Sequence, residues 1–241
     1  MIERVEVLGM EFDQLTKASL LAELDKKIIS EEKTFIVTAN PEIVMYAKEN
    51  TSYNKLVKDA DYVIADGIGV IYGAKLLKKY LPERIPGYEL MLDLLRIGNE
   101  KKLSVYFLGA QQDVIDELQV NVRKSFPNLI IVGARNGYFR PEDTTIQEEI
   151  KKANADFIFV ALGYPRQEEW INKHMDKFNK GIFMGVGGSF DVLAEKVKRA
   201  PLIWQKLNLE WLYRLLKQPS RWRRMLVLPK FLIEVLKVRG K

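Results

Sequence analysis

Short apolar runs alternate with longer amphipathic segments over most of the chain. The runs are four to eight residues long and rich in Val, Ile and Phe. Strands that are apolar on both faces and separated by helices are typical of a parallel sheet covered on both sides. The sequence therefore predicts an α/β, Rossmann-like fold with a mostly parallel sheet and helices on both faces. The predicted strands are Val5–Phe12, Phe35–Thr38, Tyr62–Ala65, Ser104–Leu108, Leu129–Gly133, Phe157–Leu162 and Ile182–Val186, and the predicted helices are Thr16–Ser30, Gly69–Tyr80, Tyr88–Glu100, Gln112–Phe126, Thr144–Ala153 and Pro165–Phe178.

The last 46 residues, Lys196 to Lys241, differ from the rest of the chain in charge. They hold 13 Lys or Arg against two Glu, together with three of the four tryptophans, whereas residues 1–195 hold 25 basic and 30 acidic side chains. The net charge of +6 therefore combines a body of −5 with a tail of +11. A cationic, tryptophan-bearing segment is expected to meet a polyanion, either a membrane surface or a nucleic acid. We predict a body over residues 1–195 and a basic, amphipathic helical tail over residues 196–241.

The tail divides into two predicted helices. The first begins at Pro201, and Pro219-Ser220 ends it. The second covers roughly Arg221–Val238 and is predicted to bend at Pro229. Packing on the body or an oligomer interface would also account for the apolar positions. Those of the first helix are Trp204, Leu207, Trp211, Leu212 and Leu215.

Composition excludes several classes of site. The chain has no cysteine, which excludes disulfides and thiolate chemistry, and its single histidine, His174, excludes a multi-histidine metal centre. The first residues lack the pattern of a signal peptide, and no apolar run has the roughly 18 residues of a spanning helix. We therefore expect a cytoplasmic protein whose membrane contact, if it has one, is peripheral.

Four predicted strands end in unusual polar or glycine-rich turns. Ligands of open parallel sheets bind beyond the carboxyl ends of the strands, so these turns are candidates for one site. Each has a simpler explanation, because Thr38, Asn40 or Asp66 could cap a helix and a glycine pair could merely turn the chain. Their number favours a site. The turns are Thr38-Ala39-Asn40-Pro41, Asp66-Gly67, Gly163-Tyr164-Pro165-Arg166-Gln167-Glu168 and Gly187-Gly188-Ser189-Phe190-Asp191.

Two competing motifs are weak. The glycines of Gly67-Ile-Gly69-Val-Ile-Tyr-Gly73 resemble a dinucleotide fingerprint and keep a nicotinamide-dependent oxidoreductase as an alternative. However, they follow the third strand and lack the expected downstream acid. Asp59-Ala-Asp61 resembles a metal-binding D-x-D but precedes its strand, so no metal site is predicted. A nucleic-acid-binding module would fit the tail charge, but the apolar face of the tail argues against it.

Several segments, in this order, resemble the WecG/TagA/CpsF glycosyltransferase family. The resemblance extends from near residue 30 to about residue 230. Besides the four turns, it rests on Glu83-Arg84-Ile85-Pro86-Gly87, Asn136-Gly137-Tyr138-Phe139, Lys198-Arg199-Ala200-Pro201, Glu210-Trp211-Leu212-Tyr213-Arg214 and Pro219-Ser220-Arg221-Trp222-Arg223-Arg224. Two positions depart from the family pattern, which usually has glycine at Glu195 and commonly aspartate at Glu89.

The resemblance implies an inverting hexosyltransferase. N-acetylmannosamine would pass from its UDP conjugate to the C4 hydroxyl of N-acetylglucosamine on undecaprenyl diphosphate, in the synthesis of the wall teichoic acid linkage unit. N-acetylmannosaminuronic acid or glucose remains an alternative donor sugar. No cofactor is expected. The acceptor lipid implies work at the inner face of the cytoplasmic membrane, with self-association of the tail in free solution as an expectation and nucleic acid excluded as a partner.

This reaction needs a base for the acceptor hydroxyl and positive charge for the leaving diphosphate. Asp66 is assigned as the base, and Thr38, Asn40 and Gln167 are assigned to the sugars. Without a metal motif, arginines must meet the phosphate charge, because guanidinium groups bind phosphate bidentately. The arginine candidates are Arg84 of the body and Arg214, Arg221 and Arg224 of the tail, and the candidates for uridine and donor binding are Tyr138, Gly187 and Asp191.

Overall fold

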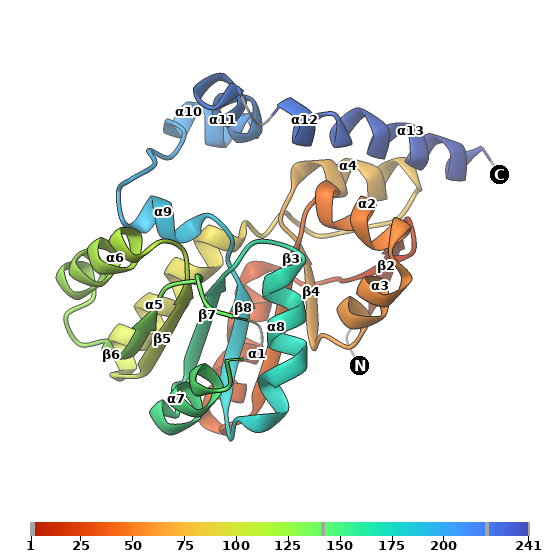
Figure 1. Cartoon of the computed structure of the whole chain (residues 1–241). Coiled ribbons are helices and arrows are strands. Elements are labelled where there is room, and N and C mark those ends of the chain that lie inside the picture. The colour runs from red at the N-terminus through yellow and green to blue at the C-terminus, as the bar shows by residue number, and fades with distance from the viewer. Residues whose placement is uncertain (1–2, 141–142, 220–221, 241) are drawn as a thin grey trace.

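The predicted α/β fold is confirmed by the computed structural model, which describes residues 3–140, 143–219 and 222–240 (Figure 1). At its centre, six parallel strands form one sheet in the order β4-β3-β8-β7-β5-β6. The chain enters the sheet at β3, next to the β4 edge, then adds β4 at that edge and β5 and β6 at the other, and fills the middle last with β7 and β8. The strands are β3 (Lys33–Ala39), β4 (Tyr62–Ala65), β5 (Ser104–Gly109), β6 (Ile130–Arg135), β7 (Phe157–Ala161) and β8 (Gly181–Gly185).

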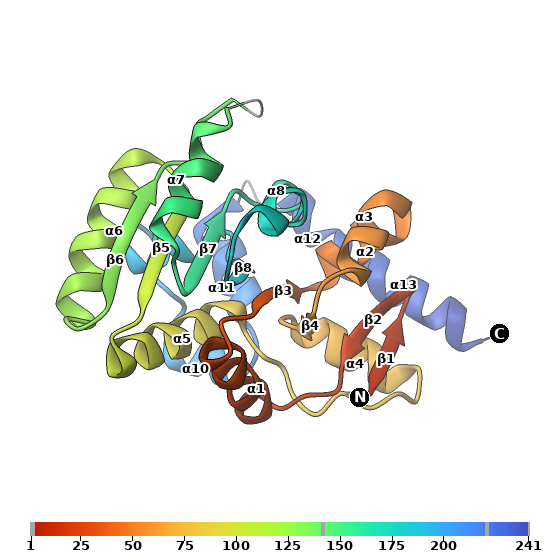
Figure 2. The ribbon, with the colours of Figure 1, turned by 90° about the horizontal axis from the view of Figure 1, so that it is seen from below.

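Helices cover both faces of the sheet, as Figure 2 shows. One face packs on α1, α5, α6 and α9, and the other packs on α2, α3, α7 and α8. Within β3, Phe35 and Val37 face the second group of helices, whereas Ile36 faces the first. The helices are α1 (Lys17–Ile29), α2 (Pro41–Glu49), α3 (Thr51–Lys58), α4 (Ile68–Leu76), α5 (Gly87–Lys101), α6 (Gln112–Ser125), α7 (Thr145–Ala153), α8 (Arg166–His174) with a 3-10 turn at Met175–Lys177, and α9 (Ser189–Leu193).

The prediction of a single strand over Val5–Phe12 is wrong. This segment forms an antiparallel hairpin of β1 (Arg4–Val7) and β2 (Met10–Asp13), separate from the main sheet. Leu8 and Gly9, between the strands, have φ angles of 53° and 87°. Two successive residues with positive φ make the tight turn that joins twisted antiparallel strands. The apolar run therefore folds back on itself instead of entering the parallel sheet.

The tail contains more breaks than the sequence predicts. Its helices are α10 (Leu202–Lys206), α11 (Glu210–Lys217), α12 (Trp222–Met225) and α13 (Val227–Arg239). Asn208, with φ of 58°, separates α10 from α11. Pro229 lies in the first turn of α13, where its missing N–H costs no hydrogen bond, so the helix starts near this proline instead of bending there. In Figure 1 these helices cross beyond the carboxyl ends of the strands.

The end of the tail packs directly on the body. Phe231 and Val235 of α13 are buried, and α13 contacts both α2 and α4. Gly73 of α4 allows this approach, because a Cβ atom there would lie 2.8 Å from the Phe231 ring. No helix among the described residues is long and apolar enough to cross a membrane. The boundary near residue 195 thus separates two segments that touch, and their independence as domains stays a prediction.

Candidate active site

The ends of β3 and β4 bring Asn40 and Asp66 next to each other. Ala39 and Ala65 are register partners in these parallel strands, and the Asp66 N–H donates a 3.0 Å hydrogen bond to the Ala39 carbonyl. Asn40 is the N-cap of α2, and its Oδ1 accepts a hydrogen bond of 3.1 Å from the Ile43 N–H. The capping alternative is therefore confirmed for Asn40. Its side-chain NH2 has no hydrogen bond among the described residues, so the same side chain can both cap α2 and donate to a ligand.

The segment before α5 returns to the same corner of the sheet. The Ile85 N–H donates a 2.8 Å hydrogen bond to the Ala65 carbonyl, and the Gly87 N–H donates one of 3.2 Å to Asp66 Oδ1. Gly87 also lies tightly against Thr38, because a Cβ atom on it would be 2.9 Å from Thr38 Oγ1. Asp66 thus fixes the start of α5 rather than capping α4, which begins after Gly67 without a side-chain cap.

Arg84 directly precedes Ile85 and is half-buried. It forms no hydrogen bond or ion pair with the part of the chain that the structure describes. The structure therefore gathers Thr38, Asn40, Asp66 and Arg84 at two adjacent strand ends. A carboxylate, a hydroxyl, an amide and a guanidinium at one corner can bind a polyol and activate one of its hydroxyl groups.

Gln167 extends this group to the end of β8, the other neighbour of β3. Its side chain is 5% exposed, and its Oε1 accepts a 3.0 Å hydrogen bond from the Gly187 N–H. Gly185 lies directly beneath, because a Cβ atom there would be 2.5 Å from Gln167 Nε2. Gly187 has a φ of 49°, in the left-handed region that favours glycine. The glycine pair therefore makes the predicted turn, and Gln167 holds it.

Glu168 is a buried acid beside Gln167 that the sequence did not single out. It is 2% exposed, and burial raises its pKa to about 7. Gln167 Nε2 donates a 2.7 Å hydrogen bond to its Oε1. The Tyr53 hydroxyl of α3 lies near the same carboxyl, and burial together with this carboxyl raises the pKa of Tyr53. Titratable groups whose pKa is shifted this far by burial are more frequent at functional sites than elsewhere.

The residues predicted to bind uridine are spread along the edge of the sheet. Asp191 lies in α9 near the glycine turn, since its Oδ2 would be 3.7 Å from a Cβ atom on Gly188. Tyr138 follows β6, the strand at the far edge from β4, and is 75% exposed. Its hydroxyl accepts a 3.4 Å hydrogen bond from Gln111 Nε2 at the start of α6. Tyr138 is therefore not brought next to Asp66, which follows the opposite edge strand.

One tail arginine has its side chain described near the site. The charge of Arg224 lowers the pKa of Tyr164, although burial outweighs it and leaves that pKa raised. Tyr164 lies in the loop after β7, so the charge of Arg224 acts on this loop. Arg214 lies in α11, and its side chain is outside the described residues, as is the whole of Arg221.

Arg199 connects the tail to the body, a role that the sequence did not assign. Its Nη2 donates a 2.7 Å hydrogen bond to Glu89 Oε1 in the first turn of α5, and its Nε lies 3.8 Å from Glu210 Oε1 in α11. Its guanidinium carbon is 4.9 Å from the centre of the Tyr88 ring. Arg199 stands in one of the family segments, so a signal existed, but its partners are 110 residues before it and in a separate helix.

The two competing motifs have structural explanations. Cβ atoms on Gly67 and Gly69 would lie 2.7 and 2.8 Å from Pro41, and Gly73 accommodates Phe231, so these glycines allow close packing around α4. Asp61 accepts a 2.7 Å hydrogen bond from the Phe35 N–H at the amino end of β3. The glycines therefore serve packing beside the carboxyl-edge site, and Asp61 lies at the opposite end of the strands. No cluster of three or more potential metal-binding side chains occurs within residues 3–140, 143–219 and 222–240.

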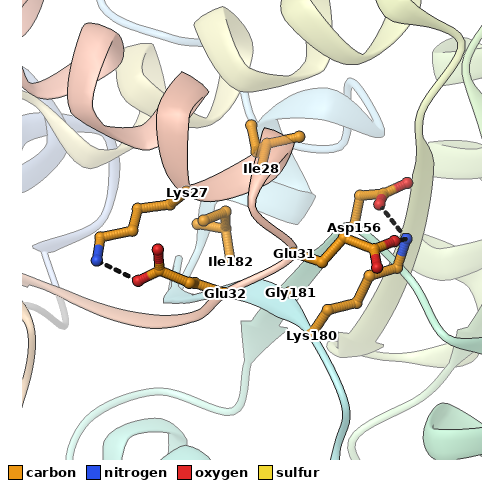
Figure 3. Close-up of a pocket in the computed structure, with 8 residues that line it drawn as sticks. All are labelled: Lys27, Ile28, Glu31, Glu32, Asp156, Lys180, Gly181 and Ile182. Atoms are coloured by element: carbon orange, nitrogen blue, oxygen red, sulfur yellow. Dashed lines mark hydrogen bonds and ion pairs between the residues drawn. The ribbon is translucent and has the colours of Figure 1, made fainter.

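A small hollow at the amino ends of the strands is also unrelated to this site. Its charged side chains pair with one another, as Figure 3 shows, with Lys180 lying 2.6 Å from Asp156 and 3.4 Å from Glu31. Its volume of about 10 Å³ suits a water molecule and no larger ligand. The candidate active site is the carboxyl edge, where the polar side chains gather.

Comparisons with known proteins show the family of the chain. A profile of the Glycosyl transferase WecG/TagA/CpsF family matches residues 5–241. A Staphylococcus aureus (strain MW2) protein named N-acetylglucosaminyldiphosphoundecaprenol N-acetyl-beta-D-mannosaminyltransferase is 40% identical, over 99% of this chain and 94% of its own length. A Bacillus spizizenii protein of the same name is 42% identical, over 95% of this chain and 89% of its own length. The chain belongs to the WecG/TagA/CpsF glycosyltransferase family.

Proposed function

We propose that this chain transfers N-acetylmannosamine from UDP-N-acetylmannosamine to the C4 hydroxyl of N-acetylglucosamine on undecaprenyl diphosphate, in the wall teichoic acid linkage unit. The observation that carries the proposal is the gathering of Thr38, Asn40 and Asp66 where β3 and β4 end, beside Gln167 at the end of β8. The names of two relatives that match over 94% and 89% of their own length support this choice of sugar and acceptor.

In the proposed reaction, Asp66 accepts the proton of the acceptor C4 hydroxyl. The hydroxyl oxygen attacks the anomeric carbon of the donor, the bond from that carbon to the UDP oxygen breaks, and the configuration inverts. The hydrogen bond from Gly87 orients the Asp66 carboxylate, and such positioning matters more for a base than a large pKa shift. Thr38, Asn40 and Gln167 hold the sugars.

Arginines meet the charge that develops on UDP. Arg84 is the candidate from the body, and at least one of Arg214, Arg221 and Arg224 completes the site from the tail. The effect of Arg224 on the pKa of Tyr164 supports this role, because it requires the Arg224 charge to be close to the loop after β7. Planar guanidinium groups bind phosphate oxygens in pairs, which suits a diphosphate leaving group.

The tail also brings the enzyme to the inner face of the cytoplasmic membrane. Trp211 and Leu216 are exposed on α11, whereas Trp204 and Leu212 are half-buried. Exposed apolar side chains beside basic ones suit an interface with anionic lipid, and in free solution the same surface would favour self-association. Leu216→Glu is expected to lower flotation with anionic vesicles. Val120→Glu, at an exposed apolar position of α6, is the control. Unchanged flotation of Leu216→Glu would contradict this role of α11.

Turnover with defined substrates tests the function. The intact chain is incubated with a short-chain lipid-diphosphate N-acetylglucosamine and, in separate reactions, with the UDP conjugates of N-acetylmannosamine, N-acetylmannosaminuronic acid and glucose. We expect the first donor to be used most efficiently, without a cofactor and with chelator present. Preference for another donor would show that the transferred sugar is not N-acetylmannosamine. NAD binding without transfer from any UDP sugar would overturn the proposed function.

A further inference from the structure

Gln167 and Glu168 form a buried pair at the start of α8. Their side chains are 5% and 2% exposed. Gln167 uses both ends of its amide, donating from Nε2 to Glu168 Oε1 at 2.7 Å and accepting at Oε1 from the Gly187 N–H at 3.0 Å. A line of hydrogen bonds therefore runs from Glu168, through the Gln167 amide, into the turn after β8.

The partners fix which way the Gln167 amide points. A carboxylate can only accept, so it faces the amide NH2, and the Gly187 N–H can only donate, so it faces the amide oxygen. Space is also restricted, because a Cβ atom on Gly185 would lie 2.5 Å from Gln167 Nε2. Without an acceptor at residue 168, the buried NH2 of Gln167 would have no hydrogen-bond partner. The Gln167 side chain would then lower its free energy by rotating toward another acceptor.

The burial of Glu168 is difficult to explain by stability alone. Its Oε2 lies outside direct hydrogen-bond distance of the described residues. The nearby Tyr53 hydroxyl lowers the pKa of Glu168, but by less than burial raises it. Burying such a group costs free energy, whereas an apolar side chain of similar volume would pack without that cost. The titratable groups that face it are Tyr53 of α3 and Glu169 of α8, with Tyr164 close to Tyr53. None of these is a cation that would neutralise the carboxylate.

We propose that Glu168 is a positioning residue for the donor side of the transfer site, acting through the Gln167 amide on Gly187. By accepting from Gln167 Nε2, it keeps the amide oxygen on the Gly187 N–H and the turn after β8 in its left-handed conformation. The turn at Gly187 therefore has its binding conformation before the nucleotide sugar binds. This inference rests on the proposed function, in which Gly187 and Gln167 belong to the donor and sugar pockets.

Two substitutions separate acceptance of the hydrogen bond from the negative charge. Glu168→Gln keeps an acceptor oxygen, whereas Glu168→Met keeps the length without one. We expect the donor KM of Glu168→Met to rise about 10-fold, the effect of one lost buried hydrogen bond, with the acceptor KM unchanged. Glu168→Gln is expected to stay within about 2-fold of the unmodified enzyme. Glu148→Gln, at an exposed acid in the first turn of α7, is the matched control.

Hydrogen exchange at the Gly187 amide tests the coupling without turnover. In Glu168→Met this amide should exchange at least about 10 times faster, with β5 as protected as before. If Glu168→Met does not fold, the NMR resonances of the Gln167 side-chain NH2 test its hydrogen bond to Glu168 instead. They should shift with pH between 5 and 8 in the unmodified chain and stay constant in Glu168→Gln.

Three results would overturn the inference: an unchanged donor KM in folded Glu168→Met, unchanged exchange at Gly187, or Gln167 resonances that do not respond to pH. Failure of the proposed function is a separate outcome. In that case the unmodified chain transfers none of the three sugars, while the exchange and resonance measurements still test the connection from Glu168 to Gly187.

Discussion

The Gly87 N–H donates a hydrogen bond of 3.2 Å to Oδ1 of Asp66. This bond ties the end of β4 to the start of α5, across 21 residues of sequence. The same glycine lies against Thr38 of β3, so one backbone position orients two of the side chains assigned to the reaction.

Asp66→Asn should remove most of the transferase activity and leave the fold intact. The Asn oxygen can still accept from Gly87, but the amide cannot take a proton, so kcat is expected to fall about 10²- to 10⁴-fold. Initial rates at saturating substrate and the melting temperature are the measurements. Asp59→Asn makes the same chemical change at an exposed position before β4 and should leave the rate unchanged. Near-normal turnover by Asp66→Asn would remove the assignment of the base.

Gly87→Ala should lower activity by displacing Thr38. The added Cβ atom would lie 2.9 Å from Thr38 Oγ1, so the threonine has to move. We expect kcat/KM to fall about 10-fold, because small displacements at a reacting centre are costly. A double-mutant cycle checks the cause. Thr38→Ser removes the methyl group that would lie 3.3 Å from the added Cβ and frees the hydroxyl to rotate away, so the penalty of Gly87→Ala should be smaller in this background. Equal penalties in both backgrounds would show that displacement of Thr38 does not cause the loss of activity.

Arg199→Ala should loosen the tail. It removes the hydrogen bond to Glu89 and the charge beside Glu210, which together connect α5 with α11. If tail arginines complete the site, the rate should fall about 10-fold or more, as when a group that stabilises developing charge is misplaced. Faster cleavage between α9 and α11 in limited proteolysis reports the loosening. Lys198→Ala, at the exposed neighbour, is the control, and normal turnover with faster cleavage would separate tail docking from catalysis.

Stability should depend on the ionisation of Glu168. Burial raises its pKa to about 7 from an ordinary 4.5, so the folded protein binds more protons than the unfolded chain between these values. The free energy of unfolding therefore falls as pH rises from about 4.5 to about 7, and then levels off. At pH 8 the unmodified chain has to bury the charged Glu168 carboxylate, whereas the glutamine of Glu168→Gln is neutral at every pH. Glu168→Gln should therefore be more stable than the unmodified chain at pH 8, by on the order of 2 kcal/mol.

Urea unfolding from pH 5 to pH 8 measures this difference. His174 acts in the opposite direction, because burial lowers its pKa to about 4 and the resulting stability is lost as pH falls below its ordinary 6.5. Since His174 is present in both proteins, its effect cancels in the comparison. Glu148→Gln, at an exposed acid in the first turn of α7, is the control. A stability difference that does not change with pH would contradict the raised pKa of Glu168.

Long-range contacts limited what could be predicted about the site. Asn40, Asp66 and Gln167 could be found because each follows a strand, and carboxyl ends of parallel strands share one edge. Arg199 and Glu168 were not singled out, since an arginine in a loop and an acid in a first helical turn look like surface residues until their burial and partners are known. The hairpin over residues 4–13 was missed because its turn lies inside an apolar run.

The sequence alone determined the kind of fold and the edge that carries the polar side chains. Apolar strands between amphipathic helices have one stable arrangement, a covered parallel sheet, and strand direction then places every strand end. Only the tertiary structure decided that Gly87 holds Asp66 and that Phe231 docks the tail on Gly73. These contacts depend on packing between segments distant in sequence, where fit within a fraction of an ångström selects the partner. Local sequence patterns do not predict such a fit.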